Sequence, residues 1–269
     1  MDRNLKNYWF GANWRNFVRF HFNEKSLIHA KSRFQELFEP ISVQGKSLLD
    51  VGCGSGIHSL VALDLGASQV VSIDIDEDSV RATSEIKRKF GKDFHQKWKV
   101  QRTSILDDSA IKALGKFDVV YAWGSLHHTG DVWGAIRNAS NCVRDDGYLA
   151  LALYSKDVTP VPSHEFWMEK KKVYVASGFL KRRAFEIWYV WRFYMNKRAW
   201  NLFKVSKRFR NHKRDRGMSL LVDVRDWLGG WPMEFVGDKE AQAFLEDLNF
   251  SLIKIITGKA NTEFVFKRN

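Results

Sequence analysis

The chain has 269 residues and a formal net charge of +12, and its 45% hydrophobic content is enough for one large domain or for a domain with an insertion. The two cysteines, Cys53 and Cys142, exclude a disulfide framework, and no spacing typical of metal ligands is present. Residues 1–14 lack the apolar core of a signal peptide and no uncharged apolar run reaches the ~18 residues of a membrane span, so we expect a cytoplasmic protein.

The chain opens with a segment, residues 7–40, whose spacing predicts helix and whose first part is rich in aromatic residues. Pro40 and Gly45 end this segment. Strand and helix patterns then alternate, and the last strand of this region is nearly continuous in apolar residues, as in a sheet covered on both faces. We expect strands at 47–51, 70–73, 98–103, 117–122 and 148–154, and helices at 58–64, 76–90 and 133–143.

The alternation stops after residue 155 and resumes near the C-terminus, with a helix expected at 239–248 and strands at 250–256 and 262–267. This order predicts an α/β fold with a parallel-rich, doubly wound sheet, which binds ligands at the carboxyl ends of its strands. On this basis we divide the chain into four parts. They are an N-terminal helical cap (1–44), a core (45–155), an inserted helical lid (156–236) and a C-terminal completion of the core (237–269).

The first expected strand runs into the turn Asp50-Val51-Gly52-Cys53-Gly54-Ser55-Gly56. Glycine is needed where a side chain would block a ligand from the backbone, or where φ is positive. The spacing is not the dinucleotide fingerprint G-x-G-x-x-G, because the third glycine comes one residue early, and no Gly-Lys-Ser/Thr follows as in a phosphate loop. The turn instead resembles motif I of the class I methyltransferases, which use S-adenosylmethionine.

The resemblance covers residues 45–154 and the C-terminal strands. It implies a seven-stranded, Rossmann-like sheet in the order 3-2-1-4-5-7-6, with S-adenosylmethionine as cofactor and no metal. The charged amino-acid end of the cofactor would meet the glycine turn, in which Cys53 is a small residue rather than a nucleophile. The residues implied at this end are Asp50, Gly52, Cys53, Gly54 and Gly56.

The ribose and adenine contacts are expected where the second and third strands end. Asp74 comes about 20 residues after the glycine turn, where an acid can accept hydrogen bonds from both ribose hydroxyls. The alternative is a solvated acid near the start of the next helix. In the family, the residues that match Ile75, Ser104 and Ile105 lie against the adenine, whereas Asp107 is either a further polar contact or a helix cap.

The fourth strand ends in Trp123-Gly124-Ser125-Leu126-His127-His128. The positions of Trp123 and Gly124 line the methionine half of the cofactor in the family, and a similar His-His-Thr/Ser run is frequent there. His127 and His128 are the candidate general bases, because a histidine titrates near neutral pH. The alternative is that a histidine only packs and positions the loop.

The inserted lid, residues 156–236, holds 18 Lys and Arg against 8 Asp and Glu. Apolar residues recur at helical spacing, which predicts one or two amphipathic helices. Three interpretations of this segment stay open. Its aromatic residues pack the lid onto the core and its charges are solvated, or its charge attracts an anionic acceptor or a membrane surface, or it contacts nucleic acid. The apolar positions are Ile187, Trp191, Tyr194, Met195, Leu202, Val205 and Phe209.

The end of the lid is its least generic part, because Gly229-Gly230 and Pro232 force a turn between two tryptophans. This segment either simply rejoins the core or contacts the acceptor. The N-terminal Trp9, Phe10 and Trp14 would close over the cofactor from the other side. The candidate acceptor-binding residues are Arg216, Asp226, Trp227 and Glu234.

The segments 8–14, 126–131, 216–218 and 226–232 together resemble a bacterial group named by analogy with ubiquinone-biosynthesis methylases. That name carries no information on the acceptor. From the whole sequence we expect a methyltransferase that uses S-adenosylmethionine and acts on a hydroxyl of a small or lipid-linked acceptor, such as a saccharide or a quinol-like compound. Two alternatives stay open, a tRNA or other nucleic-acid methyltransferase and a non-catalytic protein that binds the cofactor. Proximity and orientation can supply much of the catalysis, because the methyl group of a sulfonium is already activated.

Overall fold

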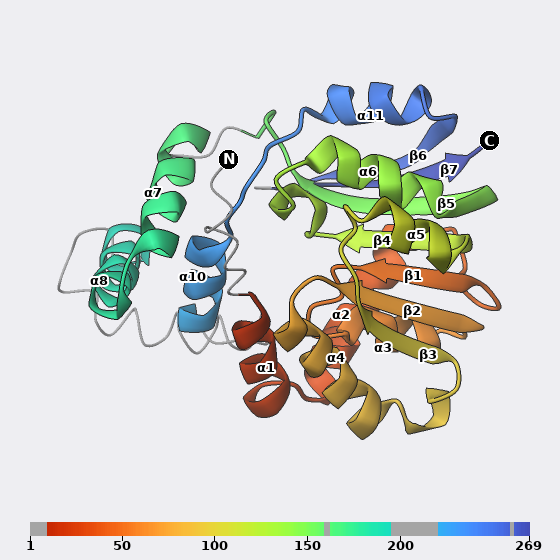
Figure 1. Cartoon of the computed structure of the whole chain (residues 1–269), viewed down its shortest axis with the longest axis horizontal. Coiled ribbons are helices and arrows are strands. Elements are labelled where there is room, and N and C mark those ends of the chain that lie inside the picture. The colour runs from red at the N-terminus through yellow and green to blue at the C-terminus, as the bar shows by residue number, and fades with distance from the viewer. Residues whose placement is uncertain (1–9, 159–161, 195–219, 259–260) are drawn as a thin grey trace.

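A seven-stranded mixed sheet forms the centre of the protein (Figure 1). The computed structural model describes residues 10–158, 162–194, 220–258 and 261–269. The strand order is β3-β2-β1-β4-β5-β7-β6, which confirms the expected order. Strands β1 to β5 are all parallel to one another, and β7 pairs antiparallel with both β5 and β6. The strands are β1 (Ser47–Val51), β2 (Gln69–Asp74), β3 (Trp98–Arg102), β4 (Phe117–Trp123), β5 (Val143–Tyr154), β6 (Phe250–Thr257) and β7 (Asn261–Arg268).

Helices cover both faces of the sheet, and each face has its own apolar core. One core contains Ile111, Ile136 and Leu245, from α5, α6 and α11. The other contains Phe34 and Ile86, from α2 and α4, together with residues of α1 and α3. The helices of these two layers are α1 (Phe10–Phe20), α2 (Glu24–Phe38), α3 (Ile57–Asp64), α4 (Glu77–Phe90), α5 (Asp108–Leu114), α6 (Val132–Asn141) and α11 (Asp238–Glu246).

The burial of the strands explains why their sequences look as they do. The central strands β1 and β4 are largely buried on both faces, so most of their residues are apolar, apart from Asp50 in β1 and Asp118 in β4. The edge strand β6 alternates between buried or half-buried and exposed residues, which is the pattern of a strand with one solvated face. This arrangement brings the carboxyl ends of β1, β2 and β4 together.

Three local details go beyond the sequence pattern or differ from it. The helical segment expected over 7–40 is divided into two helices within the described residues, because the side chain of Asn23 accepts a hydrogen bond from the amide of Ser26 and caps the start of α2. Helix α5 was not expected. Strand β5 begins at Val143 instead of residue 148, since an irregularity in its pairing with β4 lets the strand absorb Asp146 at a φ of 60°.

A separate helical layer lies between β5 and α11 in the chain and to the left of the sheet in Figure 1. Its own apolar core contains Trp167, Tyr174 and Leu228, among others. Inside it, the buried carboxylate of Glu186 accepts a hydrogen bond from Tyr174 and pairs with Arg225. The elements of this layer are α7 (His164–Ala176), α8 (Phe179–Tyr189), η4 (Val190–Tyr194) and α10 (Leu220–Gly229).

Within the described part of the chain, no helix combines the length and the apolar character that crossing a bilayer requires.

Candidate functional site

The glycine turn joins β1 to α3, and its backbone amides are bonded within the protein. The amides of Gly52 and Cys53 donate to the carbonyl of Ile73 at 2.8 and 3.0 Å, and that of Gly56 donates to Cys53 at 2.7 Å. The amide of Gly54 donates to the Asp74 carboxylate at 3.1 Å. These amides therefore form no cradle for a pyrophosphate, in agreement with the departure from the dinucleotide spacing.

Close packing explains why glycine stands at these positions. All three glycines of the turn have positive φ, and a Cβ on Gly56 would come within 2.7 Å of the Thr83 side chain on α4. A Cβ on Gly52 would lie 2.3 Å from that of Ser125, and one on Gly54 would lie 2.9 Å from the indole nitrogen of Trp14. The turn is thus pressed between α4, the loop after β4 and the overlying helix α1.

Asp50 is buried at the end of β1. Its carboxylate accepts a hydrogen bond of 2.5 Å from Ser59, whose hydroxyl also meets that of Ser72 at 2.6 Å. Ser72 in turn accepts a bond from the Trp98 indole at 2.7 Å. Burial raises the pKa of Asp50 to about 7, against the lowering effect of the Ser59 bond. Asp50 therefore belongs to a fixed polar chain beneath the glycine turn.

Asp74 ends β2 beside the glycine turn. One of its oxygens accepts from Gly54, and the other accepts from the amide of Asp76 at 2.9 Å. The N-cap of α4 is Asp76, whose side chain accepts from Asp78, so Asp74 does not cap the helix. Burial raises the pKa of Asp74 to about 6. Its carboxylate has further lone pairs for the hydroxyls of a ligand.

The loop after β3 lies next along this edge of the sheet. Ile105 packs into the core on the α5 side, and its carbonyl accepts a bond of 2.8 Å from Asn138. The hydroxyl of Ser104 accepts a bond from the amide of Leu106. Asp107 is the N-cap of α5, where it accepts from Ala110, so the helix-cap interpretation of Asp107 describes its bonding here.

The end of β4 offers open space. Gly124 has a φ of 75°, and no atom lies within 4 Å of where its Cβ would be. Trp123 is half exposed, with its ring 5.9 Å from that of His58 at the start of α3. Ser125 donates a hydrogen bond of 2.7 Å to the carbonyl of Val51, which ties this loop to the end of β1.

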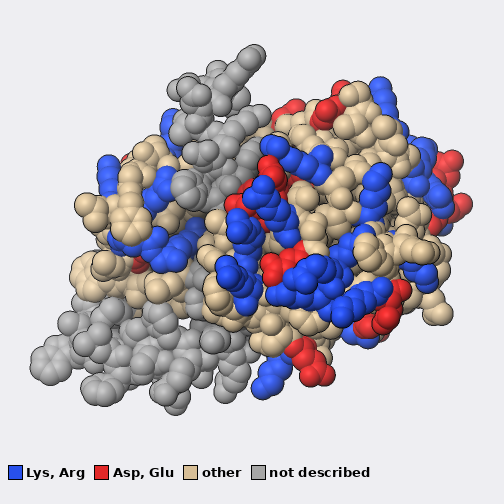
Figure 2. Space-filling model, turned by 60° about the horizontal axis from the view of Figure 1, so that its bottom comes forward, with Lys and Arg blue, Asp and Glu red and all other residues tan. Residues whose placement is uncertain are grey.

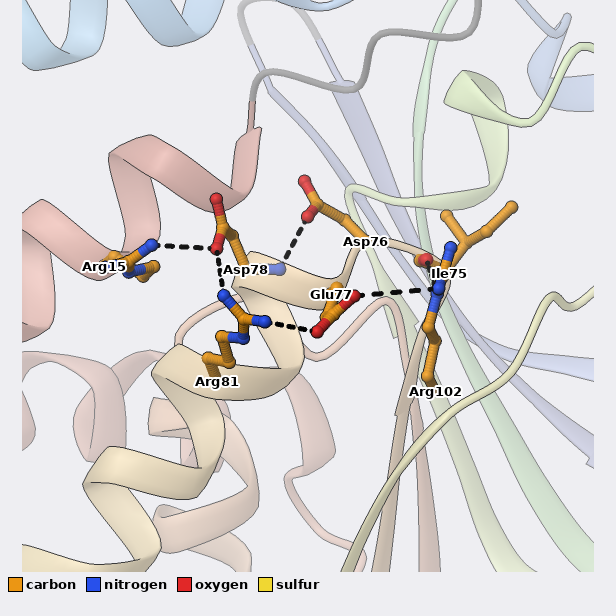
Figure 3. A network of polar contacts seen from close by, with 7 residues as sticks. All are labelled: Arg15, Ile75, Asp76, Glu77, Asp78, Arg81 and Arg102. Carbon is orange, nitrogen blue, oxygen red and sulfur yellow. Dashed lines mark hydrogen bonds and ion pairs between the residues drawn. The ribbon is translucent and has the colours of Figure 1, made fainter.

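Helix α1 packs over the glycine turn and the start of α4. The amide of Gly11 donates to Asp76 at 2.9 Å, and Arg15 pairs with Asp78 at 2.9 Å. Figure 3 shows these acids at the start of α4, with Arg15 reaching across from α1. Arg102 on β3 donates a bond of 2.9 Å to the carbonyl of Ile75 and so holds the loop after β2 from the other side.

His127 and His128 are both buried, in a short 3-10 helix η3 (Leu126–His128). The Nδ1 atom of His128 lies 2.7 Å from the carbonyl of Pro232, so it carries the proton and leaves Nε2 as an acceptor. The His127 ring bonds the carbonyl of Ala152, and its Nδ1 is buried without a hydrogen-bond partner among the described residues. Burial lowers the pKa of both rings, that of His128 to about 3, so the expectation that these histidines titrate near neutral pH needs correction.

Tyr154, at the end of β5, connects the histidines to the helical layer. Its ring centre is 4.0 Å from that of His127 and 5.8 Å from that of Trp227. Phe10 on α1 contacts His128, with 4.9 Å between ring centres. The site therefore has aromatic walls from α1, β5 and α10.

Lys171 is a residue of this cluster that sequence reasoning missed. It is fully buried on α7, its ammonium donates to the carbonyl of Trp227, and it lies 3.8 Å from the centre of the Trp227 ring. A Cβ on Gly230 would lie 3.3 Å from this nitrogen and 3.0 Å from His128. Burial lowers the pKa of Lys171 to about 7.

Lys171 is the middle residue of a run of three lysines, residues 170–172. The signal that distinguishes Lys171 is its helical position, because Trp167 and Tyr174 lie four residues before it and three after it and are both buried. The middle lysine therefore faces inward with these aromatic residues.

The candidate acceptor-binding residues lie in different surroundings. Trp227 and Glu234 border the histidine cluster, and each has a buried polar atom, Nε1 or Oε2, without a hydrogen-bond partner among the described residues. The amide of Glu234 donates to the carbonyl of His127 at 2.8 Å, and burial raises the pKa of its carboxyl. The carboxylate of Asp226 acts on Lys171 through its charge. Arg216, like Trp9, lies outside the described residues.

Ile187 and Trp191 do not pack the lid onto the core, because both are exposed. The buried positions of α8 are those on its opposite side, such as Glu186. The four remaining apolar positions of that stripe after Tyr194 lie outside the described residues.

No group of three or more His, Cys, Asp or Glu side chains in the described ranges could hold a metal ion.

Comparison with known proteins gives one family. The profile of the family described as "Methyltransferase domain" matches residues 20–211, which is well over half of the chain. A ribosomal protein L11 methyltransferase of Thermotoga petrophila is 37% identical over 94 residues, 35% of this chain and 33% of that protein. Its counterpart in Neisseria meningitidis serogroup C is 45% identical over 78 residues, 29% and 23% of the two chains. The matched stretch thus spans a third or less of these relatives.

Two solved structures share the fold. An O-methyltransferase family protein from Burkholderia thailandensis aligns with a TM-score of 0.57 and 13% identity, over 96% of this chain and 59% of that one. A magnesium protoporphyrin IX methyltransferase from Synechocystis PCC 6803, crystallised with S-adenosylhomocysteine, aligns with a TM-score of 0.54 and 15% identity, over 96% and 94% of the two chains.

Proposed function

The chain belongs to the methyltransferase domain family, whose cofactor is S-adenosylmethionine, and we propose that it transfers a methyl group to a hydroxyl oxygen of a small or lipid-linked acceptor. A saccharide or a quinol-like compound has the required group. One observation carries the proposal. The buried Nδ1 of His127 and Nε1 of Trp227 lack hydrogen-bond partners within the described part of the chain, and both rings contact the ring of Tyr154. Such atoms call for a ligand or water.

The residues at the carboxyl ends of β1, β2 and β4 fit the cofactor. Asp74 would bind the ribose hydroxyls, because its ionised carboxylate is an acceptor only. Ile75, Ser104 and Ile105 would border the adenine. The open space at Gly124, beside Trp123, leaves room for the methionine half. Bound there, the cofactor supplies a methyl group that its sulfonium has already activated.

Asp50 and the glycine turn, including Cys53, would meet the amino-acid end of the cofactor. Asp50 is held rigidly by Ser59, so its position is fixed before any ligand arrives. Trp14 lies directly over Gly54 and would cover the bound cofactor. Enclosure of this kind strengthens each electrostatic contact, because water is excluded.

His128 is the better placed of the two histidines to take the acceptor's proton. Its Nδ1 proton is committed to the carbonyl of Pro232, which leaves the Nε2 lone pair as the base. Both rings are neutral at pH 7 because burial lowers the pKa of each. The Nδ1 lone pair of His127 is the alternative base. A positioned base contributes ~10²–10⁴-fold to such a reaction.

Lys171 would act on the charge of the acceptor oxygen. Its ammonium uses one donor on the Trp227 carbonyl and has two others. A cation in a dry, aromatic site stabilises the negative charge that develops as a hydroxyl loses its proton. The positive charge of Lys171 also lowers the pKa of His128, so protonation of one side chain disfavours protonation of the other.

A nucleic-acid acceptor is less well supported. On the face that Figure 2 shows, Lys and Arg side chains lie in separate groups with Asp and Glu among them. On α4, Arg81 pairs with Glu77 and Lys89 with Glu85, so part of this positive charge is neutralised at short range. An ion-paired surface offers fewer free cations to phosphates. The third candidate, a non-catalytic protein that binds the cofactor, leaves the buried polar atoms of His127 and Glu234 without a role.

The experiment has two steps. Calorimetric titration with S-adenosylmethionine and S-adenosylhomocysteine comes first, on protein checked by mass spectrometry for co-purified ligands. Release of S-adenosylhomocysteine is then measured against panels of phenols, saccharides, lipid-linked saccharides and tRNA. Micromolar binding with turnover on a hydroxyl compound supports the proposal. Turnover on tRNA alone would refute the proposal of a hydroxyl on a small or lipid-linked acceptor. Cofactor binding without turnover on any panel would support the non-catalytic alternative.

A further inference from the structure

Helix α8 has an apolar face that is exposed and lies away from the other described elements. Leu180, Ala184 and Ile187 follow one another at spacings of four and three residues, so they share one side of the helix. Trp191 continues this line into η4. The exposed fractions of Leu180, Ile187 and Trp191 are 82%, 70% and 42%. Single exposed apolar residues are ordinary, but a continuous stripe of them indicates a binding surface.

The stripe is not needed to hold the lid together. The opposite side of α8 faces the inside of the helical layer. There Phe185 packs against the ring of Tyr174, and Glu186 accepts a hydrogen bond from its hydroxyl. Arg225 on α10 also pairs with Glu186. Helix α8 is therefore anchored by its inner side, and the outer side is left for another contact.

The charges around the stripe are positive. Residues 164–194 contain seven Lys and Arg, of which Lys171 is buried and Arg183 pairs with Glu186, and three Asp and Glu. One of the three acids, Glu186, is buried and paired, so it adds no negative charge to the outer surface. Lys181 is exposed and follows Leu180 directly, and Arg192 follows Trp191. Apolar and aromatic residues on one face with cations beside them are typical of helices that lie in the surface of a bilayer.

We propose that α8 docks the protein on an anionic membrane, with Leu180, Ile187 and Trp191 entering the boundary between headgroups and acyl chains. Lys181 and Arg192 contact the lipid phosphates. A membrane fits better than a second copy of the chain, because two copies would bring like-charged segments together. Tryptophan is also enriched at membrane interfaces. The inference goes beyond the proposed function and does not depend on it.

The test is co-sedimentation with vesicles. The wild type, Ile187→Glu and Ile28→Glu are compared on vesicles of phosphatidylcholine with phosphatidylglycerol and on vesicles of phosphatidylcholine alone. Ile28→Glu is the matched control, because it makes the same change in charge at another exposed isoleucine. Ile28 is 59% exposed and lies on α2, which packs against the sheet and not against the lid. Binding is measured at low and at high salt.

We expect the wild type and Ile28→Glu to bind the anionic vesicles, less tightly as salt rises, and to bind the neutral vesicles at least about tenfold more weakly. Ile187→Glu should reduce binding to anionic vesicles at least about tenfold, because a carboxylate replaces an apolar side chain that enters the bilayer on docking. Its affinity for S-adenosylhomocysteine and its thermal midpoint should equal those of Ile28→Glu, since the stripe is remote from the glycine turn.

Three outcomes would overturn the inference. The first is that the wild type binds neither kind of vesicle, or that both Glu variants bind equally well. The second is a wild-type dimer in light scattering that Ile187→Glu converts to a monomer, which would assign the stripe to a second copy. The third is a lower thermal midpoint for Ile187→Glu alone, which would mean that the stripe packs within the chain. Failure to bind S-adenosylhomocysteine would count against the proposed function and leave the membrane contact standing.

Discussion

The buried ammonium of Lys171 lies 3.8 Å from the centre of the Trp227 ring and donates a hydrogen bond to the carbonyl of the same residue. This contact joins α7 to the C-terminal end of α10, where the helix dipole favours a positive charge. It also fixes the amine beside His128 and Tyr154. A single lysine thus links the packing of the lid to the candidate site of methyl transfer.

Replacement of Lys171 separates these two roles. Lys171→Met keeps the length of the side chain and removes the charge, so we expect turnover to fall at least about tenfold while the affinity for S-adenosylhomocysteine stays nearly unchanged. Lys171→Arg should restore part of the turnover. Equal turnover in all three proteins would show that the lysine only fills space.

The same variant changes the pH dependence of stability. The pKa of Lys171 is about 7 in the folded protein against 10.5 for the free side chain, so between these values the unfolded chain binds more protons. The free energy of unfolding of the wild type should therefore gain a contribution that grows as pH rises from about 7 to 10.5. Lys171→Met should lack that contribution. Urea titrations of both proteins across this range would measure it, and parallel curves would contradict it.

Asp74 should control cofactor affinity. Asp74→Ala is expected to weaken binding of S-adenosylmethionine at least about tenfold with the fold intact, because the acceptor for the ribose hydroxyls is lost. In the wild type, binding should also weaken as pH falls through about 6, where the carboxylate takes up a proton. Asp74→Asn provides the control, since its affinity should lack this pH dependence. Unchanged affinity of Asp74→Ala in calorimetry would disprove the ribose assignment.

The two histidines should affect turnover and not cofactor binding. His128→Ala should lose about 10²-fold or more in turnover, because it removes the Nε2 base, while S-adenosylhomocysteine still binds. His127→Ala removes a ring that contacts Tyr154, so it is the comparison that decides which histidine accepts the proton. If each variant keeps wild-type turnover on an accepted hydroxyl compound, neither histidine is the base.

Gly56 tests the packing of the glycine turn. Gly56→Ala places a Cβ within 2.7 Å of the Thr83 side chain at a φ of 79°, so both a clash and backbone strain destabilise the fold. Gly45→Ala is the control, because its φ is 73° with open space around it. We expect Gly45→Ala to cost about 1–2 kcal/mol of unfolding free energy and Gly56→Ala about 1–3 kcal/mol more. Equal losses in denaturant titrations would remove the steric argument.

The sequence by itself determined the strands and the glycine turn, whereas the order of the sheet and the cofactor followed from the resemblance of that turn to methyltransferase motif I. Buried parallel strands need apolar residues on both faces, and a turn pressed between α1, α4 and the loop after β4 needs glycines, so both leave a local pattern that can be read directly. Asp74 could be singled out for the same reason, because its position is set by its distance along the chain from the turn. These features depend on neighbours in sequence.

Only the tertiary structure decided the surroundings of the histidines and the outer face of the lid. Lys171 meets Trp227 and His128 because α7, α10 and η3 converge, and no spacing along the chain encodes that meeting. Ile187 has the helical period of a core residue, yet it is exposed, because periodicity shows that a helix has an apolar face and not what covers it. Contacts between distant segments follow from packing, which a local pattern does not contain.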